Sequence, residues 1–163
     1  MTTEYGTGDF EKDMADVIEL CGTWWDDSLF YKLYGIEFSV DKSWFRLIKD
    51  YGLIYTCGRQ EGKLVSCYVG IKTPYMFNPS VMTANEIVWC VHKDYRNYRE
   101  LIGLMKAIED LMKSNDIKLW NLAVSNEEKY LPTAEFLERQ GYNFMDRCYS
   151  KYQGEKKWLN LPQ

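Results

Sequence analysis

Histidine and proline are scarce in this 163-residue chain, which has one histidine, His92, and four prolines. The five cysteines are dispersed and include no Cys-x-x-Cys pair, so a zinc site would have to gather scattered thiols. We therefore expect no metal site. We expect the thiols to be reduced, as in a cytoplasmic protein.

Long apolar runs are lacking as well. No stretch approaches the roughly 20 apolar residues of a membrane span. Residues 1–10 lack the apolar segment of a secretory signal. The sequence therefore predicts a cytoplasmic location and no association with a membrane.

Positive charge is sparse in the first quarter of the chain. Residues 1–41 hold two Lys and ten Asp or Glu, residues 42–163 hold eighteen Lys or Arg and fourteen Asp or Glu, and the net charge is −4. Because there is no basic stripe, nucleic acid is not an expected partner. The acidic part either attracts a basic substrate or forms a solvated acidic helix.

Aromatic residues, in contrast, are plentiful, at 16% of the chain. They provide bulk for a core and argue against disorder. One dense group lies between Trp24 and Phe38, and it contains more aromatic residues than a loop needs. This group is therefore a candidate partner surface.

The spacing of apolar residues divides the chain into helices and strands. Helices are expected over about residues 9–20, from residue 41, over 98–113 and over 132–140, and strands over 53–57, 64–72, 86–91, 118–124 and 142–152. Residues 73–79 contain two prolines and are expected to form a loop. The order predicts an α/β class protein with a mixed α+β sheet. It forms a single domain over residues 1–152 with a C-terminal tail over residues 153–163.

Four segments at the junctions of these elements carry a family resemblance. They are the strand Glu86–His92, the turn Asp94–Asn97 before the long helix, the strand Leu119–Val124 with Ser125 and Asn126 after it, and the stretch Ala134–Tyr142. In this order they resemble the GNAT superfamily of acetyl-CoA-dependent N-acyltransferases. Segments such as Phe77–Pro79 and Leu119–Asn121 also resemble GNAT-like proteins of tailed bacteriophages. The resemblance implies a GNAT-like acyltransferase fold, a central mixed β-sheet flanked by helices on both faces.

The resemblance also implies a site for acetyl-CoA as co-substrate. Its pyrophosphate loop corresponds to Arg96–Leu101, with Arg99 and Leu101 where the family has glycine and a small residue. Arg96 and Arg99 either contact phosphates or form ion pairs with Asp94 and Glu100. The full set of implied cofactor-binding residues is Val91, His92, Arg96, Asn97, Tyr98, Arg99, Glu100, Leu101 and Asn126. Val91 and His92 are expected to act through main-chain atoms that pair with the pantetheine arm.

Catalysis in the GNAT superfamily, which the chain resembles, requires a general base and often a general acid. Glu86, at the start of the central strand, is the expected base, with His92 as the alternative. A main-chain N–H around Cys90 or Val91 is expected to meet the oxyanion. Leu137 stands where the family has its tyrosine acid, so Tyr149 is the expected acid, with Tyr130 and Tyr152 as alternatives.

Two functions follow from the resemblance. The first is an N-acetyltransferase that moves an acetyl group from acetyl-CoA to an amine of a protein or small molecule. The resemblance to GNAT-like proteins of tailed bacteriophages implies that it is encoded by a phage. A basic protein is one acceptor that suits the acidic N-terminal part. The second is a GNAT-fold protein without catalysis that binds a host protein, forms a homodimer or serves as a virion component.

Overall fold

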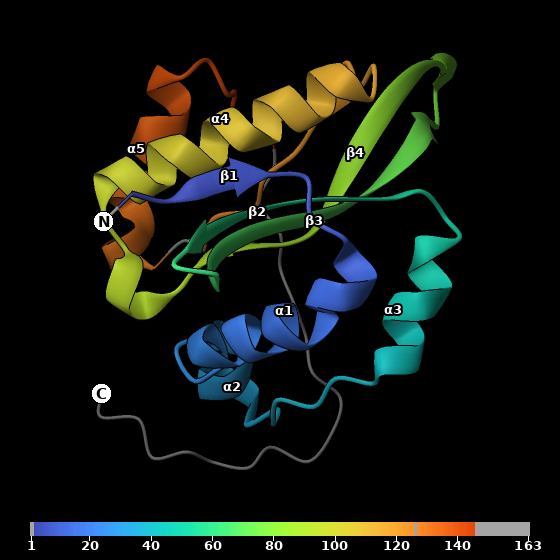
Figure 1. Cartoon of the computed structure of the whole chain (residues 1–163). Helices are drawn as coiled ribbons and strands as arrows, with labels where there is room; N and C mark the ends of the chain where they lie inside the picture. Colours follow the sequence, from blue (N-terminus) through green and yellow to red (C-terminus); the bar gives the residue numbers. More distant parts are fainter. Residues whose placement is uncertain (1, 126, 146–163) are drawn as a thin grey trace.

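A computed structural model of the chain describes residues 2–125 and 127–145. The order of elements is β1 (Glu4–Gly6), α1 (Phe10–Trp25), α2 (Leu29–Tyr34), α3 (Lys42–Lys49), β2 (Leu53–Gln60), β3 (Lys63–Tyr75), β4 (Asn78–Val91), η1 (Lys93–Tyr95), α4 (Tyr98–Ser114), β5 (Leu119–Trp120), η2 (Glu128–Tyr130) and α5 (Leu131–Arg139). Five strands form one sheet in the order β1-β2-β3-β4-β5 (Figure 1). The first three pairings are antiparallel, and β4 with β5 is parallel. The predicted mixed sheet is confirmed.

Helices cover both faces of this sheet. On one side α1, α2 and α3 lie below the strands, and on the other α4 and α5 lie above them (Figure 1). The buried residues accordingly divide into two clusters, one around Val17 of α1 and Val69 of β3, the other around Ile108 of α4 and Tyr68 of β3. Neighbouring residues of one strand enter opposite clusters because side chains alternate across a sheet.

The two long helices begin where capping residues and apolar spacing coincide. Asp9 accepts a hydrogen bond from the Glu11 N–H at the start of α1, and Asn97 accepts one from the Glu100 N–H at the start of α4. Four apolar side chains of α1 are buried, namely Phe10, Met14, Val17 and Leu20. Both helices were predicted from this spacing, although α1 continues to Trp25.

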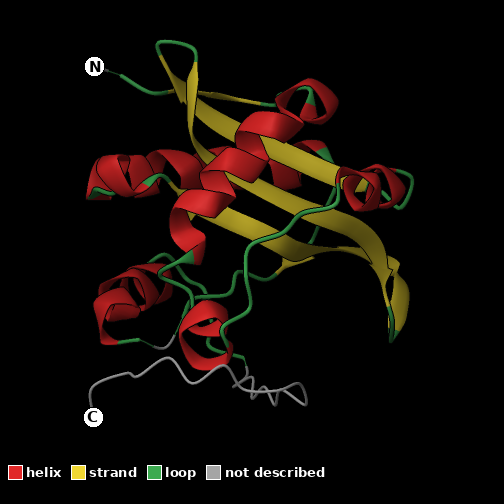
Figure 2. Cartoon of the chain, turned by 90° about the horizontal axis from the view of Figure 1, so that it is seen from below, coloured by secondary structure: helices red, strands yellow, loops and turns green. Residues whose placement is uncertain are grey.

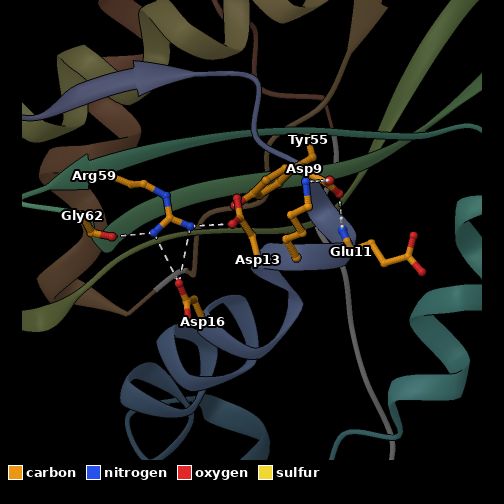
Figure 3. Close-up of polar contacts among 8 residues, drawn as sticks. Asp9, Glu11, Asp13, Asp16, Tyr55, Arg59 and Gly62 are labelled. Atoms are coloured by element: carbon orange, nitrogen blue, oxygen red, sulfur yellow. Dashed lines mark hydrogen bonds and ion pairs between the residues drawn. The ribbon is translucent and has the colours of Figure 1, made fainter.

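Acidic side chains of α1 join this helix to the sheet (Figure 3). Arg59 of β2 donates from Nη2 to Asp13 at 2.6 Å and lies 3.3 Å from Asp16 through Nη1. The Tyr55 hydroxyl also donates to Asp13, at 3.2 Å. On the outer side of the helix, Glu11 pairs with Lys49 of α3. Much of the acidic charge of the N-terminal part is thus used in internal ion pairs.

The structure corrects three element predictions. Residues 73–79 are not a simple loop: β3 and β4 continue as a hairpin that extends beyond the helices (Figure 2). Pro74 is accommodated because it lies next to the irregularity between Pro74 and Tyr75 in the pairing with β4. The strand predicted over 118–124 pairs only at Leu119 and Trp120. The short strand β1 was not predicted.

The two C-terminal predictions can be compared with the structure only in small part. The predicted strand over 142–152 and the tail over 153–163 fall mostly outside the described residues. Cys57, Cys67 and Cys90 are buried as predicted, and the Cys67 and Cys90 sulfurs are 3.8 Å apart. Among the described residues, no helix is long and apolar enough to cross a membrane.

Candidate functional site

The central feature of the site is the point where β4 and β5 part. Their parallel pairing covers only Thr83 with Leu119 and Ala84 with Trp120. Directly after this pairing, the register of β4 against β3 shifts by one residue. Gly70 pairs with Glu86 and the preceding Val69 pairs with Val88, so Ile87 has no partner in the register. Such a bulge increases local twist and redirects the strand. β4 therefore turns away from the chain that follows β5.

Side chains span the two segments where their backbone pairing ends. The Glu86 carboxylate accepts a hydrogen bond from the Ala123 N–H at 2.5 Å, and the Trp89 indole donates to the Ala123 carbonyl at 2.7 Å. The Glu86 N–H in turn donates to the Asn121 side chain at 3.4 Å. Asn121, Trp89 and Ala123 thus fix Glu86 at this position. The sequence did not single out these three residues as neighbours of Glu86, because nothing in the strand pattern shows where the pairing stops.

The surroundings of Glu86 shift its protonation equilibrium. Glu86 is half-buried, and this burial raises the pKa of its carboxyl to about 7, although the Ala123 N–H opposes the rise. A carboxyl with this pKa is present in both protonation states near neutral pH. It can therefore take up a proton and release it again under physiological conditions.

Beyond Glu86, β4 presents main-chain groups on its side away from β3. The His92 N–H donates to the Val65 carbonyl at 2.8 Å and so points toward β3. Because backbone groups alternate along a strand, the N–H groups of Val91 and Trp89 point to the opposite side. The Val91 carbonyl on that side accepts from Nε of Arg96 at 3.1 Å.

His92 itself is engaged within the protein. Its Nδ1 accepts a hydrogen bond from the Asp94 N–H at 3.2 Å, and its ring packs edge-on against Tyr95. Burial lowers the pKa of His92. The structure therefore places the His92 main chain in the sheet and its side chain at the start of η1, rather than beside Glu86.

The first turn of α4 offers donors for an anion. Asn97 satisfies the Glu100 N–H at 3.0 Å through its side chain and the Leu101 N–H at 3.1 Å through its carbonyl. The N–H groups of Tyr98 and Arg99 have no partner within the helix, because they belong to its first turn. The helix dipole favours negative charge at these groups.

Glu100 does not point toward such an anion. Its side chain is buried, with 3% exposed, and accepts hydrogen bonds from Ser66 at 2.8 Å and Thr3 at 2.6 Å. Leu101 packs into the cluster around α4. Glu100 and Leu101 thus anchor the helix. Of the two residues that depart from the family's loop, Leu101 packs inward and Arg99 is exposed.

Arg96 has partners other than those considered from the sequence. Its Nη1 is 3.9 Å from Asp27, between α1 and α2, whereas Asp94 lies beside His92 and Glu100 is buried. Asp27 also lies 3.7 Å from Lys129 of η2, just before α5. The predicted ion pairs of Arg96 and Arg99 with Asp94 and Glu100 are therefore absent from the described contacts.

The position expected for a tyrosine acid holds an apolar residue that faces the core. Leu137 is buried among α4 and α5 residues. Tyr130, just before α5, has a buried hydroxyl without a hydrogen-bond partner among the described residues. Tyr149, Tyr152 and Asn126 lie outside the described residues. Within the described ranges, no group of three or more His, Cys, Asp or Glu could hold a metal ion.

Comparison of the sequence with known families and with curated proteins gives no match. Solved structures do match. An aminoglycoside acetyltransferase from an uncultured soil metagenomic sample superposes with a TM-score of 0.72 at 11% identity over 94% of this chain and 100% of the other. Glucosamine-6-phosphate N-acetyltransferase from Arabidopsis thaliana gives 0.67 at 18% identity, covering 94% and 100%.

A third match was solved with acetyl-CoA. It is a Clostridium acetobutylicum protein described as an acetyltransferase, with a TM-score of 0.65 and 12% identity over 93% of this chain and 96% of the other. At such identities the likeness concerns the fold. The chain has the α+β fold of GNAT acetyltransferases, with a mixed five-stranded sheet and helices on both faces.

Proposed function

We propose that this protein is an N-acetyltransferase that transfers an acetyl group from acetyl-CoA to an amine. One observation carries the proposal: a carboxyl group with a pKa of about 7, Glu86, is held where β4 parts from β5. An amine must lose a proton when it attacks a thioester, and a carboxylate with this pKa can accept that proton at neutral pH. The fold shared with acetyltransferases supports the same reaction.

The donors present fit acetyl-CoA. The N–H groups of Tyr98 and Arg99 at the start of α4, together with the Arg96 and Arg99 guanidinium groups, suit a pyrophosphate. Glu100 does not repel it, because its carboxylate is buried beneath the helix. The outward main-chain groups of Trp89 and Val91 suit the amides of a pantetheine arm, which pairs like an added strand.

Each residue then has a defined role. Bound acetyl-CoA supplies the thioester carbonyl that the amine attacks. Glu86 accepts the proton that the amine nitrogen loses. The N–H of Val91 or Trp89 donates to the oxygen on which negative charge develops. Tyr149 stays the predicted acid and lies outside the described residues; of its two alternatives, only Tyr130 is described, with its hydroxyl buried beside Lys129.

The acceptor is an amine, and the class of molecule that carries it is a separate proposal. Asp13 and Asp16 of α1 are paired with Arg59, so they add little to an acidic acceptor surface. A basic protein therefore has weaker support than the sequence suggested. The phage origin and the cytoplasmic location stay predictions, and examination of neighbouring genes would test the first.

A second candidate function is binding without catalysis. The Arg96 guanidinium already contacts Asp27 and the Val91 carbonyl. These contacts compete with a cofactor for Arg96 and for the Val91 carbonyl. Phe30 and Leu33 of α2 are 46% and 51% exposed, beside the stacked Trp25. Such a surface suits a host protein or a second copy of the chain. This function requires no acetyl-CoA, so a single titration separates it from the first.

The deciding experiment is calorimetric titration with acetyl-CoA. We expect saturable binding that Arg96→Ala weakens by about tenfold, the loss of one charge-assisted contact, while Arg46→Ala on α3 leaves it unchanged. In turnover with an amine panel, Glu86→Gln should reduce the rate about 100-fold or more without weakening acetyl-CoA binding. Absence of binding at millimolar acetyl-CoA would leave only the second function.

A further inference from the structure

Tyr68 of β3 carries a polar group that the reaction described above does not use. Its side chain is 0% exposed, and its hydroxyl has no hydrogen-bond partner among the described residues. Buried hydroxyl groups nearly always have a partner in native proteins. An unpaired one therefore marks a place where a further molecule can bind.

The position of this hydroxyl is set by Gly70. A Cβ atom at residue 70 would lie 2.5 Å from the Tyr68 oxygen, so only glycine leaves the ring room to lie along β3. Gly70 is paired with Glu86 on β4. The Tyr68 hydroxyl thus lies over Gly70, the β3 residue that is paired with Glu86.

Electrostatics agree with this placement. Burial raises the pKa of the Tyr68 hydroxyl, and the negative charge of Glu86 raises it further. The Glu86 carboxylate uses Oε2 for the Ala123 N–H. A carboxylate can accept several hydrogen bonds, so Oε1 can still accept from a group on the Tyr68 side.

We propose that Tyr68 positions a single water molecule between its hydroxyl and the Glu86 carboxylate, and that this water relays the amine proton to Glu86. The Tyr68 hydroxyl and the Glu86 carboxylate offer this water two partners, and the amine would be a third. Tyr68 is a positioning residue, since it acts through the water and Glu86. The inference rests on the proposed acetyl transfer.

The proton relay accompanies the formation of one bond and the cleavage of another. The amine nitrogen uses its lone pair to form the N–C bond, and the C–S bond breaks with its electron pair going to sulfur. The nitrogen gives its proton to the water, which passes one of its own protons to the Glu86 carboxylate. Glu86 later returns that proton to solvent, so the base is unchanged after each turnover.

Other titratable groups around this pair are few. No charged side chain of the described residues shifts the pKa of Glu86, which responds to burial and to Ala123. From the segment after α5, Tyr142 lies near Tyr68, and its hydroxyl accepts a hydrogen bond from Trp120 at 2.9 Å. From α4, Glu109 acts on Tyr142. A change at Tyr68 should therefore be read most directly at Glu86.

The test is a titration of Glu86 in the free protein, followed by the carboxyl signal of ¹³C-labelled glutamate, with the resonance assigned through Glu86→Gln. Tyr68→Phe keeps the ring but removes the donor that stabilises the carboxylate. We expect the Glu86 midpoint to rise by about one pH unit, the effect of one lost hydrogen bond. Tyr55→Phe, a buried tyrosine facing the other side of the sheet and bonded to Asp13, is the control and should not move it.

In turnover, the acidic limb of the pH–rate profile should shift upward with the Glu86 midpoint, while the KM for acetyl-CoA stays within twofold. A Glu86 midpoint that is unchanged in Tyr68→Phe, or that moves equally in Tyr55→Phe, overturns the proposal. The titration needs no activity. If the protein does not transfer acetyl groups at all, the proposed function fails, yet the coupling of Tyr68 to Glu86 is still decided.

Discussion

At the scale of single residues, the burial of Glu86 has a cost in the free energy of folding. A half-buried carboxyl with a pKa of about 7 prefers its neutral form, so ionisation destabilises the folded state. The Ala123 N–H compensates only in part. Such an arrangement is typical of sites where reactivity rather than stability determines the environment of a residue.

Glu86→Gln should therefore stabilise the protein at alkaline pH. Between the unfolded pKa near 4.5 and the folded value near 7, the folded state binds more protons, so the free energy of unfolding of the wild type falls as pH rises. Above pH 7 the loss levels off, at up to about 3 kcal/mol. Gln keeps an acceptor for Ala123 and has no charge to bury.

The measurement is urea unfolding of both proteins at pH 4 and pH 8.5. We expect equal stability at the lower pH and a more stable variant at the higher one. Glu138→Gln, at an exposed site on α5, is the control and should show no such pH dependence. A variant that is less stable than the wild type at pH 8.5 would contradict the raised pKa of Glu86.

At the scale of elements, the first turn of α4 combines a structural end and a binding end. Asn97 and Glu100 point toward the protein and fix the turn, through the Glu100 N–H and through Ser66 and Thr3. Arg96 and Arg99 are exposed, and Arg96 contacts the Val91 carbonyl and Asp27. The loss of glycine at residues 99 and 101 is compatible with a phosphate loop, because the anchoring uses other atoms than the two outward N–H groups.

Asn97→Ala should weaken this end of the helix. It removes the side-chain cap at the N-terminal end of α4 and leaves the Glu100 N–H without its partner, which costs about 1 kcal/mol. Asn97→Ser keeps a capping oxygen and should retain most of the wild-type stability. Urea unfolding at pH 7 measures both. If the two variants lose equal stability, the cap does not support the helix.

Some helices and strands could be predicted from the sequence and others could not. The helices α1 and α4 were foreseen because four or more apolar side chains recur at helical spacing above a capping residue. The family resemblance named Glu86 and the α4 turn for the site, and their roles stay predictions. The extension of the β3–β4 hairpin was not foreseen, because Pro74 and Pro79 oppose a strand locally and are accepted only at its edge and irregularity. Nor was the position of Gly70 opposite Glu86, which depends on a register shift between Val69 and Gly70.

At the scale of the whole molecule, β1 ties the start of the chain to α4. β1 pairs with β2, and next to it the Thr3 hydroxyl donates to the Glu100 carboxylate. The Tyr5 hydroxyl donates to the Glu100 carbonyl at 3.2 Å. The Tyr5 ring lies against Gly103, where any Cβ would overlap it. Residues almost a hundred positions apart thus support the same turn that we propose for the cofactor.

Gly103→Ala tests this link between β1 and α4. In an isolated helix alanine is more stable than glycine by about 1 kcal/mol. Here the new methyl group must displace the Tyr5 ring, which breaks its hydrogen bond to Glu100 and loosens β1, a cost of about 1–3 kcal/mol. We expect a net loss of stability in urea unfolding and faster amide exchange in β1. Gly6→Ala, where a Cβ meets nothing within 4 Å, is the matched control. A Gly103→Ala protein more stable than the wild type would show that helix propensity outweighs the contact, and that β1 is not held by Tyr5.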